Sequence, residues 1–132
     1  MSTMLTIRDE EMTGKTRHEF SLEVLTERIT VRELIRSRVF QEVKDHNASQ
    51  NQREFCGLIQ PTDAEKTLNG FRLKKSRQIN WQEQFDKAVE AFANQQILVL
   101  VDDVQVESLD DEIEIATTTA VSFLRLVLLV GG

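Results

Sequence analysis

Residues 97–132 read ILVLVDDVQVESLDDEIEIATTTAVSFLRLVLLVGG and carry the clearest secondary-structure signals of the chain. This stretch opens with an unbroken aliphatic run at 97–101, and a short apolar run bounded by turn residues is typical of a strand. The pair Asp102-Asp103 then predicts a tight turn, because aspartate tolerates the backbone conformations that short turns need. A second strand is predicted at 104–106, so the run forms a hairpin.

The same stretch ends in a long, leucine-rich segment. Residues 119–129 are predicted to form a final strand, and Gly131 and Gly132 follow it. Between the hairpin and this strand, residues 108–111 are predicted to form a short helical turn. The stretch therefore supplies three strands and an extended tail at 128–132.

Closer to the N-terminus, two alternating segments predict another hairpin. Residues 4–8 and 20–24 each alternate apolar and polar side chains, which is typical of strands covered on one face. A helix is predicted to begin next, because Thr30 and Glu33 have the spacing at which side chains cap the first backbone amides of a helix. Its apolar residues recur at three- and four-residue steps, so one face can lie on a sheet while the arginines face water. These apolar residues are Val31, Leu34, Ile35, Val39 and Val43.

The middle of the chain carries weaker signals. We interpret residues 47–94 as an insertion within a single domain that spans residues 1–132. A second helix is predicted inside the insertion, because Asn80 and Glu83 repeat the capping pattern. Trp81 begins the apolar stripe of this helix, and an aromatic residue at such a position is typically part of a core.

This order of elements resembles that of ubiquitin and its relatives. Residues 97–132 are similar to the second half of ubiquitin: an aliphatic strand, a two-residue turn, a short strand, a serine-leucine-aspartate turn and a leucine-rich strand that ends in Gly-Gly. Residues 30–35 resemble the threonine-capped start of the family's central helix, whereas the insertion has no counterpart in ubiquitin. The resemblance implies an α+β, ubiquitin-like β-grasp fold, with a mixed sheet of four to five strands packed on a central helix and an inserted segment that carries a second helix.

The resemblance also implies a function, as a ubiquitin-like protein modifier. In this family a partner enzyme uses ATP to convert the terminal glycine carboxylate, here that of Gly132, into an acyl-adenylate and then a thioester, which passes to a target amine. Gly131 and Gly132 suit the narrow channel of such an enzyme, because glycine adopts conformations closed to other residues. The implied partners are an ATP-dependent activating enzyme, a conjugating enzyme, a deconjugating peptidase and protein targets, in a bacterial ubiquitin-like conjugation system.

Two alternative functions stay open. Leu128, Leu129 and Val130 stand where ubiquitin has arginines, so a partner that binds this tail must accept an apolar segment. Bacterial sulfur carriers of the molybdopterin and thiazole pathways share the fold and the Gly-Gly end and also have a less basic tail, which makes a sulfur carrier with a Gly132 thiocarboxylate the first alternative. The second is a β-grasp interaction module whose tail is never activated.

A partner-binding face is expected on the strand at 97–101. A strand covered on one face needs only every second residue to be apolar, so some of these five side chains must point outward. By alignment with ubiquitin, Leu98 and Leu100 would lie on the face that carries an aliphatic docking patch in that protein. The alternative is that the second helix covers them as a further core layer.

Composition and charge argue against several classes of partner. A net charge of -6 gives no electrostatic footprint for DNA or RNA, and the basic residues at 28–38 are interpreted as a solvated helix face. The most apolar segment, 123–130, is far shorter than the roughly 20 residues that cross a bilayer. We therefore expect neither nucleic acid nor a membrane as a partner. A single cysteine and the lack of a secretory signal favour a cytoplasmic setting.

No catalytic, metal or cofactor site is expected. His18 and His46 lie far apart in the sequence, and neither has metal-ligand spacing with Cys56. Cys56 itself is expected to be a buried or inert thiol. The chain also has no phosphate-binding loop and no nucleophile elbow, so it is not expected to be an enzyme.

Two acidic pairs remain as candidate cation or acid-base sites. For Asp102-Asp103 we favour turn chemistry as the reason for the pair. For Asp110-Asp111 we favour electrostatic stabilisation of a helix start.

Overall fold

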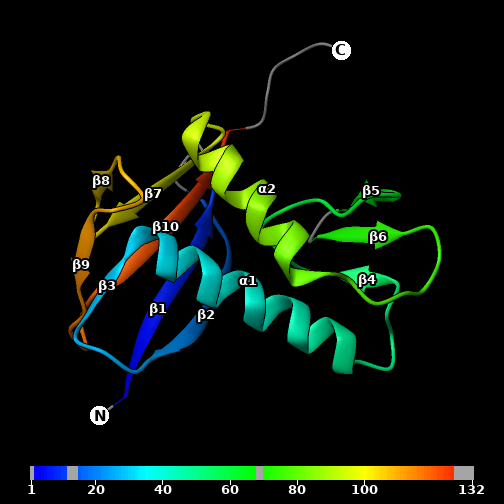
Figure 1. Cartoon of the computed structure of the whole chain (residues 1–132), viewed down its shortest axis with the longest axis horizontal. Coiled ribbons are helices and arrows are strands. Elements are labelled where there is room, and N and C mark those ends of the chain that lie inside the picture. The colour runs from blue at the N-terminus through cyan, green and yellow to red at the C-terminus, as the bar shows by residue number, and fades with distance from the viewer. Residues whose placement is uncertain (1, 12–14, 68–69, 127–132) are drawn as a thin grey trace. The chain divides into compact units, whose positions relative to one another are not determined.

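Figure 1 shows the computed structural model of the chain, which describes residues 2–11, 15–67 and 70–126. The predicted tail at 128–132 lies outside these described residues.

The described fold divides into two compact units. Unit 1 consists of Met1–Leu34 and Val89–Gly132, and unit 2 consists of Ile35–Ala88. The division falls inside each of the two helices, so each helix contributes residues to both units.

Unit 1 is built on a mixed sheet of five strands, which confirms the prediction of an α+β fold with such a sheet (Figure 1). Its strands are β1 (Thr3–Glu10), β2 (Thr16–Val24), β7 (Ile97–Val101), β8 (Val104–Val106) and β10 (Ala120–Arg125). Across the sheet the order is β2-β1-β10-β7-β8; β1 and β10 are parallel, and the other neighbours are antiparallel. A separate antiparallel pair joins β3 (Arg28–Thr30) to β9 (Glu112–Glu114).

Alternation along the strands decides which residues enter the core of unit 1. Leu5 and Ile7 of β1 are fully buried. Val121 and Phe123 of β10 continue this inner row, with Val99 of β7 opposite Phe123, and all three are also buried. Each such side chain contributes roughly 1.5–3 kcal/mol through its burial. The sheet therefore has one apolar inner face and one more polar outer face.

The four shorter predicted strands lie inside or coincide with β1, β2, β7 and β8. The final strand is shorter than predicted, because β10 ends at Arg125 and Leu126 belongs to no strand. The predicted residues 127–129 lie outside the described part of the chain. Residues 108–111 form a hydrogen-bonded turn, in which the Asp111 N–H donates to the Ser108 carbonyl (3.1 Å).

Helix α1 (Val31–Ala48) begins where the capping pattern predicts. The Glu33 N–H donates to the Thr30 hydroxyl (3.1 Å), and the Thr30 N–H donates to the Glu33 carboxylate (3.3 Å). All five residues of the predicted apolar stripe are buried. The prediction that the arginines face water is wrong for Arg38, which is only 1% exposed. Arg38 lies four residues after Leu34, so the helical period places it on the buried stripe.

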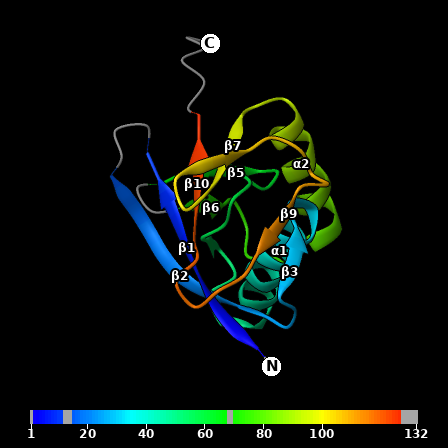
Figure 2. The same cartoon turned by 90° about the vertical axis from the view of Figure 1, so that its left-hand side faces the viewer.

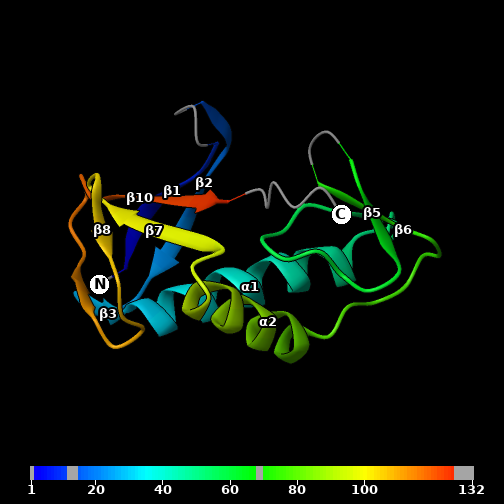
Figure 3. The same cartoon turned by 90° about the horizontal axis from the view of Figure 1, so that it is seen from above.

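Unit 2 contains a small antiparallel sheet that the sequence patterns did not predict. Its strands are β4 (Glu54–Phe55), β5 (Ala64–Lys66) and β6 (Phe71–Leu73), in the order β4-β6-β5. Figure 3 shows β5 and β6 side by side. Each strand has only two or three residues, too few for an alternating pattern to be recognised.

Helix α2 (Trp81–Ala93) confirms the second predicted helix and its cap. The Asn80 side-chain oxygen accepts the backbone N–H groups of Gln82 (2.9 Å) and Glu83 (3.1 Å). Trp81, predicted to be a core residue, is half-buried. Among the described residues, neither helix has the length and apolar character that a membrane crossing requires.

The C-terminal end of α2 is closed by a pair of backbone hydrogen bonds. The Gln96 N–H donates to the Ala91 carbonyl (2.8 Å), and the Gln95 N–H donates to the Phe92 carbonyl (3.1 Å). Gln95 has a φ of 59°, so the chain reverses through a left-handed residue in the Schellman arrangement.

Candidate partner-binding face

Leu98 and Leu100 share the outer face of the five-stranded sheet. Along β7 they alternate with Ile97 and Val99, which are buried, whereas both leucines are half-buried. The alternation thus places the two predicted residues on the same side of the strand.

The neighbouring strands set what surrounds these leucines. Leu100 lies opposite Ser122 of β10 on one side and Gln105 of β8 on the other. Leu98 lies opposite Leu124 of β10. Leu98, Leu100 and Leu124 thus form a small aliphatic area on this face, with Ser122 of the central strand and Gln105 of the edge strand as polar neighbours.

A shallow hollow of about 260 Å³ adjoins Leu98. Phe92 and Ile97 supply apolar surface to it, and Gln95 and Gln105 supply amides. Its volume is slightly below the range of typical small-molecule sites, which suits it to one inserted side chain of a protein partner better than to a whole ligand.

The strand that leads toward the C-terminal glycines is held on both sides. β10 pairs with β1 along one edge and with β7 along the other. Directly after β10, the Leu126 N–H donates to the Gln96 carbonyl (2.9 Å). The chain is thus fixed as far as its last described residue. The predicted tail residues Leu128, Leu129, Val130, Gly131 and Gly132 lie outside the described residues.

The Asp102-Asp103 pair forms the tight turn between β7 and β8. Both residues have positive φ, 48° and 70°, as a two-residue hairpin turn with favourable twist requires. Asp102 also bonds to Ala120 at the start of β10: its N–H donates to the Ala120 carbonyl (2.8 Å), and its carboxylate accepts the Ala120 N–H (2.9 Å). The two positive φ values confirm the turn interpretation of the pair, whereas the bonds to Ala120 were not predicted.

The Asp110-Asp111 pair lies against the start of α1. The Arg32 guanidinium donates to the Asp110 carboxylate (2.6 Å), and the Arg32 N–H donates to the Leu109 carbonyl (3.0 Å). The Val31 N–H donates to the Asp111 carbonyl (3.0 Å). The turn therefore satisfies two of the free amides at a helix start, but that helix is α1 and not one formed by residues 108–111.

Sequence reasoning missed a buried polar network in unit 2. The Arg38 guanidinium donates to one oxygen of the Glu42 carboxylate (2.7 Å), and the other oxygen accepts the Leu58 N–H (2.7 Å). A charged pair four residues apart, beginning on an apolar stripe, is the signal that could have revealed it.

His46 is a second missed feature of unit 2. It is 5% exposed, and its ring nitrogens lie 3.1 Å from the Glu54 carbonyl and 2.9 Å from the Arg77 carbonyl. Its place on α1, three residues after Val43, could have indicated burial. Both ring nitrogens are engaged with backbone, so His46 is a structural residue.

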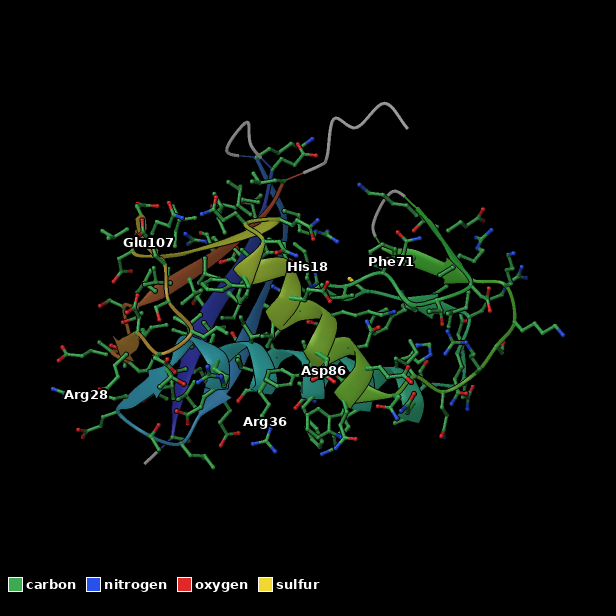
Figure 4. All side chains as sticks on the ribbon, turned by 45° about the horizontal axis from the view of Figure 1, so that its top comes forward. His18, Arg28, Arg36, Phe71, Asp86 and Glu107 are labelled. Atoms are coloured by element: carbon green, nitrogen blue, oxygen red, sulfur yellow. The ribbon has the colours of Figure 1, made fainter. Side chains whose placement is uncertain are left out.

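An aromatic cluster stands on the exposed side of unit 2. The rings of Phe40 and Trp81 lie 5.5 Å apart, and those of Trp81 and Phe85 lie 6.4 Å apart. The Arg36 guanidinium lies 5.4 Å from the centre of the Trp81 ring, within the range of a cation–π contact. Figure 4 shows Arg36 extending outward from α1.

The remaining candidate residues do not converge on a site. His18 is exposed on β2. Cys56 was expected to be a buried or inert thiol; it is exposed in unit 2, so the first of these two alternatives is wrong. In the described part of the chain, no group of three or more histidine, cysteine, aspartate or glutamate residues is arranged to hold a metal ion.

Comparison of the chain with protein-family models, with curated proteins and with solved structures finds no match.

Proposed function

We propose that this chain is a ubiquitin-like protein modifier with a β-grasp fold, activated at the carboxylate of Gly132 and joined to amines on other proteins. The observation that carries the proposal is the strand order β2-β1-β10-β7-β8 with β1 and β10 parallel at the centre. Parallel neighbours require a crossover connection, and α1 follows the β1–β2 hairpin in that connection. A mixed five-stranded sheet with a helix in the crossover is compatible with the β-grasp fold that the resemblance to ubiquitin implies.

The position of β10 also supports a role for the tail. Because β10 is paired along both edges, it would hold the start of the tail in a fixed position where a partner enzyme can bind it. The enzyme would bind the apolar side chains of Leu128, Leu129 and Val130. Gly131 and Gly132 would then enter the narrow channel of that enzyme. Leu98 and Leu100, on the outer face, would contact the activating or conjugating enzyme.

The proposed reaction is carried by the partner enzymes, and the chain supplies only the acyl group. The Gly132 carboxylate, free as a terminus or after a peptidase has cut behind it, displaces pyrophosphate from ATP and becomes an acyl-adenylate. A cysteine thiolate of the enzyme displaces AMP to give a thioester, and a target amine displaces the thiolate to give an isopeptide bond. The chain itself would be no enzyme and hold no cofactor, and an ATP-rich cytoplasm would be its setting.

The test is to detect the bond that this chemistry makes. The full chain with an N-terminal tag is incubated with ATP and magnesium in extract of its source cells, and adducts are purified and digested with trypsin. Arg125 is the last basic residue before the tail, so trypsin should leave residues 126–132, Leu-Val-Leu-Leu-Val-Gly-Gly, attached to target lysines. Mass spectrometry should find this remnant only when ATP is present.

Variants separate the possible outcomes. Deletion of Gly132 should abolish the remnant, whereas Thr117→Ala, a change at an exposed residue, should leave it unchanged. Replacement of one carboxylate oxygen by sulfur in the intact chain, without lysine remnants, would instead identify a sulfur carrier. Absence of any ATP-dependent product would overturn activation and leave a binding module.

A further inference from the structure

A groove of about 440 Å³ lies in unit 1 beside β8 and β9. Residues from both strands line it, together with the end of β7 and the segment before β10. Figure 2 views the molecule from the side on which β9 and this segment face the reader. Its volume falls in the range of sites that hold peptide side chains and small ligands.

The floor of this groove is apolar and partly uncovered. Ile113 of β9 is buried, and Val101 and Val106 are half-buried. Val104 of β8 is 68% exposed, the highest exposure of any described large apolar side chain except Leu25. Val106, on the same face of β8, is half-buried, so the more exposed Val104 adds uncovered apolar surface to the groove.

β8 also presents a free strand edge next to the groove. It is the last strand of the sheet, and among the described residues no strand pairs with its outer side. The two-residue turn makes Val101 and Val104 a hydrogen-bonded pair, so at the next position Gln105 directs its N–H and C=O away from β7. The next outward N–H, that of Glu107, already donates to the Asp111 carboxylate (3.3 Å). The edge therefore offers Gln105 as a short pairing site.

The charge around the groove indicates what kind of segment fits it. Every ionisable side chain between residues 97 and 124 is acidic. Asp102, Glu112 and Glu114 line the groove itself, and Arg28 lies 3.9 Å and 3.1 Å from the two glutamates. The side chains of Arg28, Glu112 and Glu114 are each more than half exposed, so the two ion pairs between them are weak. Figure 4 shows Arg28 on β3 and Glu107 on the segment after β8.

We infer that this groove docks an extended segment of another protein, in which an apolar side chain is flanked by lysine or arginine. The segment pairs with the backbone of Gln105 as an added strand, and its apolar side chain packs on Val104 and Ile113. Its basic residues lie beside Asp102 and the acidic wall of β9. A second copy of this chain is disfavoured as the occupant, because two such grooves would bring like charges together. This inference is independent of whether Gly132 is activated.

The test uses the full chain, labelled with ¹⁵N, and two synthetic peptides. One is acetyl-Lys-Lys-Val-Ile-Val-Lys-amide, and the other replaces each lysine by glutamate. The lysine peptide should shift the amide resonances of residues 101–106 and 112–119 in a saturable manner. Its affinity should fall at least tenfold between low and high salt, whereas the glutamate peptide should not bind.

A matched pair of variants locates the site. Val104→Asp should weaken binding of the lysine peptide at least tenfold, whereas Met4→Asp, at another exposed apolar residue of the same sheet, should leave it unchanged. Amide spectra report whether each variant is folded. Should Val104→Asp not fold, Val104→Thr, which keeps the shape, serves in its place with a smaller expected loss.

Three results of the peptide and variant experiments would overturn the inference. They are equal binding of both peptides, shifts centred outside the two stated ranges, and equal effects of the Val104 and Met4 substitutions. Self-association of the chain that Val104→Asp abolishes would identify a second copy as the occupant, and would overturn it equally.

Discussion

At the scale of single residues, Glu42 is notable because its carboxylate is largely buried in unit 2 and depends on its hydrogen-bond partners. Its side chain is 10% exposed, and its carboxylate accepts hydrogen bonds from both Arg38 and the Leu58 N–H. One carboxylate thus joins α1 to the segment between β4 and β5. A buried charge is tolerated only when its partners are in place, so this site should be sensitive to substitution.

Glu42→Ala should lower the free energy of unfolding by about 3–5 kcal/mol, because it removes the carboxylate that Arg38 meets in a buried site. Glu65→Ala, at an exposed residue of β5, is the control and should change stability by less than about 0.5 kcal/mol. Chemical denaturation monitored by Trp81 fluorescence measures both. Equal stability of the two variants would show that the ion pair is dispensable.

Gly57 makes the same region intolerant of added volume. A Cβ at this position would collide with the buried ring of Phe55 and with the carboxylate oxygen of Glu42 that binds Leu58. Gly57→Ala should therefore destabilise the protein by about 1–3 kcal/mol, as overpacking does. Ser76→Ala, at an exposed position of the same unit, is the control. A fall in melting temperature for Gly57→Ala no larger than that for Ser76→Ala would show that the site tolerates the added Cβ.

At the scale of elements, the end of α2 is closed by a residue that is not optimal for it. Gln95 takes a left-handed conformation, which side chains with a Cβ adopt at a cost and glycine adopts freely. Gln95→Gly should raise stability by about 0.5–1 kcal/mol. Asn94→Gly, one position earlier and outside the left-handed site, should not, and calorimetry of the two variants distinguishes them. A lower free energy of unfolding in Gln95→Gly would mean that contacts of the Gln95 side chain stabilise the fold by more than the left-handed backbone conformation destabilises it.

The long elements were predictable because their signals are local. The Thr30–Glu33 cap marks the start of α1, Asn80 marks the start of α2, and the aliphatic run ending at the Asp102-Asp103 turn marks β7. The strands β3 and β9 were not predicted, because each has three residues and exists only through its pairing with the other. Their stability comes from contacts distant in sequence, which no local pattern records.

The burial of individual polar residues was predicted less well than the elements that carry them. Arg38 and His46 both lie at helical steps from buried apolar residues, yet the arginines were expected to face water and no burial was predicted for His46. Their burial depends on Glu42 and on the carbonyls of Glu54 and Arg77, which only the folded chain brings near. For the candidate site, the alignment with ubiquitin placed Leu98 and Leu100 on one outward face, but no sequence pattern predicted the neighbouring hollow.

At the scale of the whole molecule, the two units share both helices. The division falls within α1 after Leu34 and within α2 after Ala88, so neither unit can lose its structure without interrupting a helix. Because helix formation is cooperative over several turns, we expect the chain to unfold in one transition.

This expectation can be measured with one reporter in each unit. Trp81, the only tryptophan, reports on unit 2 by fluorescence, and hydrogen exchange of the β10 amides reports on unit 1. The free energies from the two measurements should agree within about 1 kcal/mol. Glu42→Ala should lower both by the same amount. Separate midpoints, or a loss confined to Trp81, would show that the units unfold independently.

The parallel pairing of β1 with β10 has a mechanical consequence. Tension between the start of β1 and the end of β10 draws two parallel neighbours in opposite directions along their length. The bonds that join residues 6–10 to residues 120–124 are then loaded together in shear, instead of one after another as in an unzipping hairpin. A chain attached through its C-terminal segment would therefore resist a force applied to its N-terminus. A motor protein that unfolds the chain in this way would need its greatest force to separate β1 from β10.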